Sequence, residues 1–252
     1  MPPRSQKAGP PLAESLTIVI PVYNEGENIK KTVAEIEEKV STPHGIIVVY
    51  DFDEDNTLPP ARELIAQGLS LRLVKNAYGR GALNAIRTGI ERVHGGAVLV
   101  AMGDLSDDMT AVDGMFRLFL QGFDVVCGSR YMKGGRQLGG PWLKGQMSRL
   151  AGLSLHLLAG IPCHDVTNSF KLYRKAIFDK IQIESTGGFE LGLEITVKAH
   201  FLGFRVTEVP STWRDRSAGQ SRFRLWKWLP HYLHWYLFAL GRRFFPGPGQ
   251  HQ

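Results

Sequence analysis

The first half of the chain alternates between short apolar runs and longer segments in which apolar residues recur at helical spacing. The runs are rich in β-branched residues and are typical of buried strands. In the longer segments, apolar side chains fall on one helix face. Strands are predicted at Leu16–Val22, Ile46–Tyr50, Leu71–Lys75, Ala97–Met102 and Asp124–Gly128. Helices are predicted at Asn28–Val40, Ala61–Ala66, Gly81–Arg92 and Met115–Leu120.

Strands that alternate with helices predict a mostly parallel sheet between helices, which is an α/β fold. In such sheets, ligands bind beyond the carboxyl ends of the strands. Polar residues stand at this point after several predicted strands, namely Tyr23-Asn24-Glu25, Asp51 and Asp104. We therefore expect a ligand site at this edge of the sheet.

After Gly128 the pattern becomes less regular. The Gly-rich and basic segment Lys133–Gly140 is predicted to be a mobile loop, and such loops often carry function. Helices are predicted at Met147–Ala159 and within Gly187–Gly203, and a late edge strand is predicted at Arg205–Val209.

Composition narrows the class of protein. The 252 residues fit one domain of ordinary to large size, or at most two small ones, and 43% hydrophobic residues exclude a disordered chain. Cys127 and Cys163 provide neither a disulfide framework nor a zinc pattern. The apolar runs are shorter than the about 20 residues of a membrane-spanning helix, and the N-terminus lacks a signal-peptide core. We expect a basic cytoplasmic protein, either soluble or peripheral to a membrane.

The formal charge of +6 is unevenly distributed. Basic residues strongly outnumber acids between Arg205 and Arg243, so this part is expected to attract anions such as phosphates or an anionic membrane surface. Aromatic residues accompany the basic ones in Phe223–Phe245, a combination typical of an interfacial helix. A helix that packs in the core or in a dimer is the alternative.

Carboxylates cluster after the fourth predicted strand, at Asp104, Asp107 and Asp108. Carboxylates this close repel one another unless a cation or hydrogen-bond donors intervene. Mg²⁺ binds a few carboxylates together with phosphate oxygens and water. Ser106 or Asp107 could instead cap the helix around Met115, and the spacing alone does not separate the two interpretations.

Three other segments could bind a nucleotide or an anion. A carboxylate in Asp51–Asp55 could accept hydrogen bonds from a base or ribose, although an acidic turn is the commoner interpretation. Gly79-Arg80-Gly81 is a weak phosphate-loop signal, because it lacks the Walker and dinucleotide spacings. Arg130 follows a strand and forms, with Lys133 and Arg136, a basic loop suited to oxyanions.

Several motifs occur together in one order along the chain. They are Pro21–Glu25 (PVYNE), the strand ending at Asp51, Gly79–Ala82 (GRGA), Asp104-Leu105, Gly128–Arg130 (GSR), Asp165–Tyr173 (DVTNSFKLY), Gly203–Pro210 (GFRVTEVP) and Arg216–Arg222 (RSAGQSR). This set resembles family 2 glycosyltransferases of the dolichyl- or polyprenyl-phosphate sugar synthase kind. The resemblance extends from about Leu16 to Tyr236, which is nearly the whole chain.

The resemblance implies a GT-A fold, a nucleotide-diphospho-sugar donor, a lipid-phosphate acceptor, and Mg²⁺ or Mn²⁺. Asp51 matches the carboxylate that contacts the base, and Asp104 matches an acid of the metal-binding motif. Lys144 and Ser148 match positions where the family often has Arg and Ser. The predicted catalytic residues are Asp104, Arg130, Lys144 and Ser148. The predicted donor-binding residues are Pro21, Tyr23, Glu25, Asp51, Arg80, Asp104, Arg216 and Ser221.

The sequence departs from the family pattern at three places. Met102 replaces the first acid of the metal-binding motif, so the metal is predicted at Asp104 with Asp107, or through water and pyrophosphate. Tyr50-Asp51 replaces the usual Asp-Asp before the base site. Asn168-Ser169 replaces the commoner Ser-Gly in the acceptor loop.

The predicted activity is inverting transfer of a hexose, with mannose favoured, from a nucleotide-diphospho-sugar to a polyprenyl or dolichyl phosphate at the membrane surface. A lipid phosphate is already anionic, so the enzyme needs positioning and charge control rather than a strong base. One alternative is a hydroxyl acceptor with a catalytic base within Asp165–Glu194. Another is a non-catalytic nucleotide-sugar-binding protein, suggested by Met102. Nucleic acid is not an expected partner, because acids occupy the strand ends.

The expected organisation follows from these assignments. Residues 1–14 form a disordered tail, 15–222 the GT-A domain, 223–243 an amphipathic aromatic and basic helix, and 244–252 a second tail. Because a lipid acceptor requires access to the bilayer, the helix or a membrane partner is expected to bring this cytoplasmic protein to the membrane surface.

Overall fold

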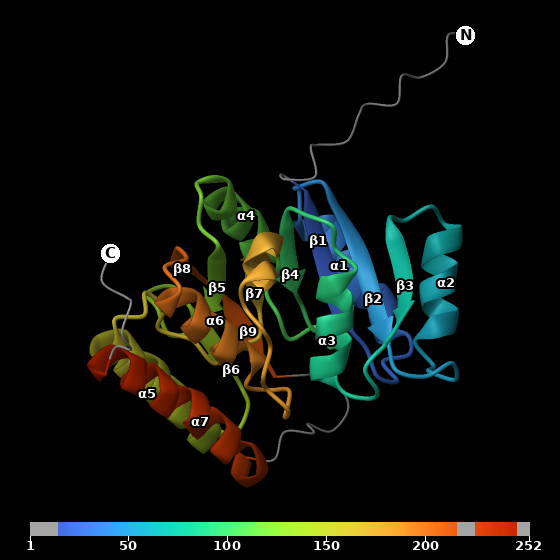
Figure 1. The fold of residues 1–252 in the computed structure, drawn as a ribbon. Coiled ribbons are helices and arrows are strands. Elements are labelled where there is room, and N and C mark those ends of the chain that lie inside the picture. Colours follow the sequence, from blue (N-terminus) through green and yellow to red (C-terminus); the bar gives the residue numbers. More distant parts are fainter. Residues whose placement is uncertain (1–14, 216–224, 246–252) are drawn as a thin grey trace.

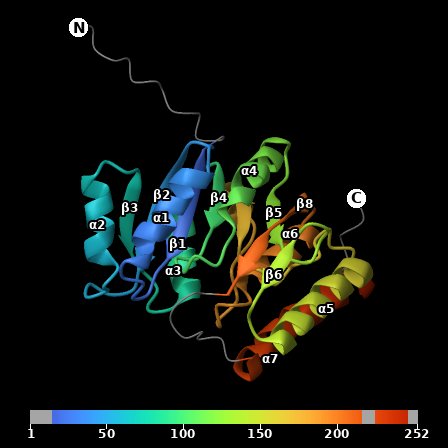
Figure 2. The same cartoon turned by 180° about the vertical axis from the view of Figure 1, so that it is seen from behind.

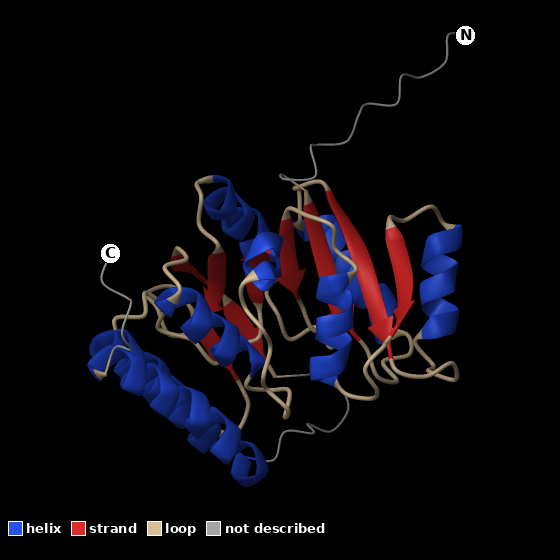
Figure 3. Cartoon of the chain, viewed as in Figure 1, coloured by secondary structure: helices blue, strands red, loops and turns tan. Residues whose placement is uncertain are grey.

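A computed structural model describes residues 15–215 and 225–245. The strands are β1 (Leu16–Pro21), β2 (His44–Tyr50), β3 (Leu71–Lys75), β4 (Ala97–Val100), β5 (Val125–Ser129), β6 (Arg136–Leu138), β7 (Lys171–Arg174), β8 (Val206–Pro210) and β9 (Thr212–Arg214). The helices are α1 (Asn28–Lys39), α2 (Leu58–Ala66), α3 (Ala82–Glu91), α4 (Val112–Leu120), α5 (Trp142–Ala159), α6 (Leu191–Phe201) and α7 (Leu225–Phe244), with the 3-10 helices η2 (Met109–Ala111) and η3 (Lys175–Asp179). Figures 1 and 3 show a central sheet with helices on both sides.

The central sheet has seven strands in the order β3-β2-β1-β4-β7-β5-β8. Neighbouring strands are parallel except at β7, which lies antiparallel between β4 and β5. The predicted α/β fold with a mostly parallel sheet is therefore confirmed, and β8 lies at the edge as predicted. The sequence does not predict β7, because its short apolar run contains Lys171, whose side chain is nevertheless buried.

Side chains alternate along each strand, so both faces of the sheet need a covering layer. Val19 faces a core shared with α3, α5, α6 and α7. Its neighbours Ile18 and Ile20 face a second core shared with α1, α2 and α4. Helix α3 lies in front of the sheet in Figure 1, whereas α1 lies in front in Figure 2. Burial on both faces explains why the strands are continuous apolar runs.

The parallel register brings the loops after β1, β2, β4 and β5 to one edge of the sheet. Helices α3 and α6 begin at this edge. Gly188, shortly before α6, lies against Leu83 in the first turn of α3, since a Cβ on Gly188 would be 3.4 Å from the Leu83 side chain. The expected ligand edge is therefore lined by four strand ends and two helix starts.

The segment Lys133–Gly140 is more ordered than the sequence predicts, because it contains β6. Strand β6 pairs in parallel with β9, far along the chain. Gly139 and Gly140 have φ values of 81° and 80°, which suit glycine, and they lead into α5. Helix α5 consequently begins at Trp142, earlier than the predicted Met147.

Helix α7 lies beside α5 in both views (Figures 1 and 2). Its residues Trp235 and Ala239 are buried and belong to the same core as α6. Helix α7 is therefore packed onto the domain along one of its faces. Over residues 15–215 and 225–245, no helix combines the length and apolar character that crossing a membrane requires.

Candidate active site

The turn after β1 is bound to the loop after β2. The N–H of Asn24, a residue with a φ of 53°, donates to both carboxylate oxygens of Asp55 at 3.2 and 3.1 Å. The next N–H, of Glu25, donates to the hydroxyl of the buried Thr57 at 3.0 Å. These bonds hold the predicted donor-binding residues of this segment at the sheet edge: Pro21, Tyr23 and Glu25.

Asp51 joins two further loops of the same edge. Its Oδ1 accepts a hydrogen bond from Nδ2 of Asn76 at 2.8 Å, and its Oδ2 accepts from the N–H of Gly81 at 3.0 Å. Gly81 has a φ of 128° and directly precedes α3. Asp51 therefore fixes the start of α3 relative to β2.

Arg80 and Tyr23 meet at an aromatic residue that the sequence analysis did not single out. The guanidinium carbon of Arg80 lies 4.9 Å from the centre of the Phe52 ring. Tyr23 meets the same ring edge-on, with centroids 5.4 Å apart. Both arrangements are favourable for an aromatic face. The structure thus brings Tyr23, Asp51 and Arg80 together around Phe52.

The acidic turn after β4 holds two buried carboxylates. Oδ1 of Asp104 accepts the N–H of Ser106 at 3.1 Å, and Leu105 between them has a φ of 63°, which is uncommon for a residue with a side chain. Oδ2 of Asp107 accepts the N–H of Met102 at 2.8 Å. The exposed fractions of Asp104 and Asp107 are 9% and 3%.

The third carboxylate, Asp108, has a structural role. It caps η2 by accepting the N–H of Thr110 at 3.2 Å, and its other oxygen accepts the N–H of Thr212 in β9 at 3.1 Å. Asp108 therefore caps η2, whereas α4, the helix around Met115, begins after Ala111 without a side-chain cap. The alternative that Ser106 or Asp107 caps α4 is wrong. Asp107 is instead turned back toward β4.

Asp104 and Asp107 fit a divalent cation that also binds phosphate oxygens, since Mg²⁺ is usually held by one or two carboxylates with substrate phosphates and water. Burial raises the pKa of Asp107 to about 7; the hydrogen bond from Met102 opposes this shift, and the negative charge of Asp104 adds to it. A cation would offset both burial and repulsion. Within the described ranges, no three His, Cys, Asp or Glu residues are grouped to hold a metal, so a cation here requires ligands from substrate or water.

Without a divalent cation, the protein is expected to lose stability as the pH rises from 3.8 to about 7. The pKa of Asp107 is raised from 3.8 to about 7 in the folded chain, so over this interval the folded protein holds a proton that the unfolded chain has lost; the stabilising contribution is fully present below 3.8 and is gone by about 7. The raised pKa corresponds to about 4 kcal/mol. Asp107→Asn keeps an acceptor for Met102 and is expected to flatten this dependence. Urea denaturation in EDTA at several pH values measures it, and equal slopes for both proteins would contradict the prediction.

Arg130 follows β5 and forms a bidentate ion pair with Asp165. Nε donates to Oδ2 at 2.6 Å and Nη2 to Oδ1 at 2.8 Å. Nη2 also donates to the hydroxyls of Ser148 in α5, at 3.0 Å, and Thr167, at 3.3 Å. Burial opposes ionisation of Asp165, but the charge and hydrogen bonds of Arg130 outweigh it and hold the pKa below its ordinary value. Two predicted catalytic residues, Arg130 and Ser148, are therefore in direct contact.

The motifs gave no individual roles to Asp165 and Thr167. Their loop is held by Lys171, whose fully buried ammonium donates to the carbonyls of Asp165 at 3.4 Å, Val166 at 3.1 Å and Asn168. A buried charge is stable only when it is paired or hydrogen-bonded. The signal that could have shown this is a single lysine within an otherwise apolar strand.

The remaining predicted residues lie near this cluster or outside the described ranges. Lys144 is half-buried in the first turn of α5, one turn before Ser148. Arg216 and Ser221 fall in 216–224, which the structure does not describe. Strand β9 leads into that segment, and the N–H of Arg214 donates to the carbonyl of Ser106 in the acidic turn at 3.0 Å. For all the site residues predicted from the sequence, the catalytic, donor-binding and metal-binding roles stay predictions.

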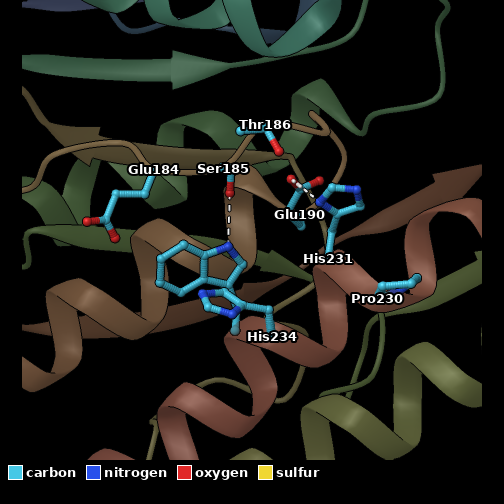
Figure 4. Close-up of a pocket in the computed structure, with 8 residues that line it drawn as sticks. Glu184, Ser185, Thr186, Glu190, Pro230, His231 and His234 are labelled. Atoms are coloured by element: carbon cyan, nitrogen blue, oxygen red, sulfur yellow. Dashed lines mark hydrogen bonds and ion pairs between the residues drawn. The ribbon is translucent and has the colours of Figure 1, made fainter.

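The segment Ser185–Glu190, here called the pre-α6 turn, borders a pocket of about 290 Å³ at α7 (Figure 4). The buried carboxylate of Glu190 accepts the N–H groups of Gly187 at 2.8 Å and Gly188 at 2.9 Å, and lies 3.7 Å from Nδ1 of His231. The lining residues are Glu184, Ser185, Thr186, Glu190, Pro230, His231, His234 and Trp235. The sequence did not predict this pocket, because it joins two segments distant along the chain.

Residues 17–182 match the family model described as glycosyl transferase family 2. The chain belongs to this family. It is therefore a glycosyltransferase, and the family inferred from the motifs is confirmed. A polyprenol monophosphomannose synthase of Mycolicibacterium smegmatis is 31% identical over 220 residues, which are 81% of this chain and 79% of that protein.

Two further relatives carry related names. A dolichol-phosphate mannosyltransferase of Pyrococcus furiosus is 25% identical over 83% of this chain, but the match spans only 59% of that protein. An undecaprenyl-phosphate mannosyltransferase of Micrococcus luteus is 28% identical over 81% of this chain and 85% of its own.

Solved structures confirm the GT-A fold. Glucosyl-3-phosphoglycerate synthase of Mycobacterium tuberculosis, crystallised with Mn²⁺, UDP and glucosyl-3-phosphoglycerate, superposes with a TM-score of 0.63 over 93% of this chain and 82% of that chain, at 16% identity. TarS of S. aureus in complex with UDP-GlcNAc gives a TM-score of 0.64 over 91% of this chain and 67% of that chain, at 14% identity. At these identities the likeness establishes the fold alone.

Proposed function

We propose that this enzyme transfers mannose from a nucleotide-diphospho-mannose to a polyprenyl phosphate, with inversion at the anomeric carbon. The names of three relatives support this substrate pair. The observation that carries the proposal is the placement, at one sheet edge, of the guanidinium of Arg130, paired with Asp165, near the carboxylates of Asp104 and Asp107, where its charge acts to lower the pKa of Asp107. Such an edge suits two phosphate groups and one cation.

A phosphate acceptor is consistent with the engagement of three acids in the range where a hydroxyl acceptor would require its base, namely Asp165, Glu190 and Glu194. The pKa of Asp165 is lowered by Arg130 despite burial, which makes it a weak base. Glu190 accepts two backbone N–H groups, and Glu194 pairs with Lys198 at 2.7 Å. A hydroxyl acceptor requires a base, whereas a phosphate oxygen is already negative. These contacts therefore favour a phosphate acceptor over the hydroxyl alternative.

The proposed roles follow from position. Asp51 binds the base, and Arg130 with Lys144 balances the charges of the acceptor and donor phosphates, while the Ser148 hydroxyl orients the acceptor. Asp104 and Asp107 would hold Mg²⁺ or Mn²⁺, which would supply positive charge to neutralise the leaving diphosphate. One phosphate oxygen attacks the anomeric carbon as the bond to the diphosphate breaks, and this single in-line displacement inverts the carbon.

A donor screen with a short polyprenyl phosphate tests the proposal. We expect GDP-mannose or another nucleotide-mannose to give a mannosyl lipid that extracts into organic solvent, read by mass spectrometry. UDP-glucose and other UDP-sugars are the comparison donors. Transfer only to hydroxyl acceptors would contradict the phosphate acceptor, and absence of donor-dependent product would support the non-catalytic alternative.

We propose that α5 and α7 together bind the membrane surface, which extends the predicted role of the C-terminal helix. Both helices expose large apolar side chains, and Trp142 at the start of α5 is 75% exposed. Arg149, Arg242 and Arg243 lie on the same two helices and suit an anionic surface. The exposed apolar residues are Trp142, Leu143, Leu150, Leu153, Leu157 and Leu158 of α5, and Leu233, Leu237 and Phe244 of α7, followed by Phe245.

Replacing Leu233 and Leu237 together by glutamate is expected to weaken binding to anionic vesicles about tenfold or more, because each buried leucine contributes about 1.5–3 kcal/mol. These side chains are 48% and 56% exposed, so folding should be retained. The matched control replaces Leu120 and Leu202 together by glutamate; these residues are 54% and 49% exposed and lie at the ends of α4 and α6. Vesicle flotation measures binding, and equal losses in both double variants would refute the proposed surface.

A further inference from the structure

Helix α7 holds the pre-α6 turn through directed contacts. Oη of Tyr232 donates to the carbonyl of Phe189 at 2.6 Å. Nε1 of Trp235 donates to Oγ of Ser185 at 3.0 Å, a bond drawn in Figure 4. The ring of Trp228 meets the ring of Phe189 edge-on, with centroids 5.3 Å apart. Both ends of the turn are therefore bound to the helix that we assign to the membrane surface.

The middle of the turn is packed tightly against α7. A Cβ on Gly187 would lie 2.7 Å from the Trp228 ring and 2.7 Å from the nearer carboxylate oxygen of Glu190, shorter than real Cβ contacts. Glu190 in turn binds the N–H groups of Gly187 and Gly188. The backbone at Gly187 is thus confined between the Trp228 ring of α7 and the carboxylate of Glu190.

The opposite side of the turn touches the edge where the donor is proposed to bind. Gly188 has a φ of 128°, and a Cβ there would lie 3.5 Å from the backbone nitrogen of Leu83. Leu83 is in the first turn of α3. This helix begins directly after Gly81, whose N–H donates to Asp51. A series of neighbouring residues therefore leads from α7 through the turn to the start of α3 and to Asp51, the residue proposed to bind the base.

We infer that Tyr232 is a positioning residue for the sugar donor, and that α7 is a structural part of the active site as well as a membrane-binding helix. This inference rests on the proposed donor site at Asp51. Tyr232 acts through the Phe189 carbonyl: its hydrogen bond fixes the turn, and the turn fixes the start of α3. Burial, and then the charge of Glu190, raise the pKa of Tyr232, so the hydroxyl remains a donor throughout the neutral range.

The same helix provides a matched control. Oη of Tyr236, one turn further along α7, donates to Oγ of Ser154 in α5 at 2.9 Å and makes no bond to the turn. Tyr232→Phe and Tyr236→Phe each remove one hydroxyl and keep the ring. Any difference between them in donor binding therefore reports the contact with the turn rather than general loosening of α7.

The experiment compares both variants with the wild type, without vesicles, using a short water-soluble polyprenyl phosphate. We expect Tyr232→Phe to raise the KM of the donor about 3- to 10-fold, the effect of one lost hydrogen bond, with the KM of the acceptor unchanged. Tyr236→Phe should leave the donor KM within about twofold of the wild type. Trp235→Phe, which loses the bond to Ser185, should act in the same direction as Tyr232→Phe.

Calorimetric titration of GDP and UDP in the presence of Mn²⁺ gives a second readout that needs no transfer. Weaker binding of the nucleotide by Tyr232→Phe but not by Tyr236→Phe supports the inference. Equal donor affinity in Tyr232→Phe and Tyr236→Phe, or a change confined to the acceptor KM, overturns it. If the wild type binds nucleotide but moves no sugar to the lipid, the proposed function fails while the nucleotide titration still decides the role of Tyr232.

Discussion

Arg130→Met is expected to lower the free energy of unfolding by about 3–5 kcal/mol and to remove measurable transfer activity. The substitution leaves the carboxylate of Asp165 fully buried without its bidentate partner. It also removes the donor to Ser148 and Thr167. Urea denaturation followed by circular dichroism measures the loss of stability, and the mannosyl-lipid assay measures activity.

The loss of stability in Arg130→Met should depend on pH. In the wild type the pKa of Asp165 is lowered, so its stabilising contribution is present above the pKa of the unfolded chain and is lost only at acidic pH. In Arg130→Met the charge of Lys171 and the backbone N–H of residue 130 still act on Asp165, but burial is the largest influence and raises that pKa, so the variant should lose stability as the pH rises. The double variant Arg130→Met with Asp165→Leu should recover much of the stability but none of the activity, because it removes the buried carboxylate that the single variant leaves without its partner, while Lys171 keeps its bonds to backbone carbonyls. A double variant as unstable as the single one would contradict this explanation.

Asp104→Asn is expected to lower kcat about 100-fold or more, provided that this carboxylate holds the cation. Asparagine keeps an acceptor for the N–H of Ser106, so the turn should stay folded. The expected loss reflects several kcal/mol of charge stabilisation at the leaving diphosphate, at about 1.4 kcal/mol for each factor of ten.

Asp108→Asn is the control for Asp104→Asn. Asp108 belongs to the same turn but binds the N–H groups of Thr110 and Thr212. Asp108→Asn should lower the free energy of unfolding by about 1 kcal/mol and change kcat only a few-fold. Initial rates over a titration of Mg²⁺ and Mn²⁺, with an EDTA blank, measure both effects. Full turnover in EDTA, or equal losses in the two variants, would show that Asp104 does not act through a metal.

Much of the architecture could be read from local patterns. The runs at β1, β2 and β4 are apolar because both faces of the sheet are covered, and helix α1 carries its apolar residues on one face. Period and composition are properties of neighbouring residues, so they are visible without the fold. Strand β7 was not predicted, because burial of Lys171 depends on three carbonyls of a loop that only the folded chain places beside it.

The candidate site shows the same division. The residue types at Asp51, Asp104 and Arg130 were evident from motifs, and their positions after strands predicted a common edge. The sequence left open whether the 104–108 turn holds a metal or provides a helix cap from Ser106 or Asp107. In the fold Asp108 caps η2, and β9 brings the N–H of Thr212 to its second oxygen. The partner of Arg130 was equally hidden, since Asp165 lies 35 residues away.

The sequence by itself determined the family, the fold class and the chemical character of each loop at the ligand edge, because these depend on residue type and short-range spacing. Only the tertiary structure decided how those loops act on one another. It joined Asp165 to Arg130, and it placed Tyr232 on the carbonyl of Phe189, 43 residues earlier. A helix whose composition is typical of an interfacial helix is therefore also bound to the turn before α6, because a hydrogen bond between distant residues depends on the path of the whole chain.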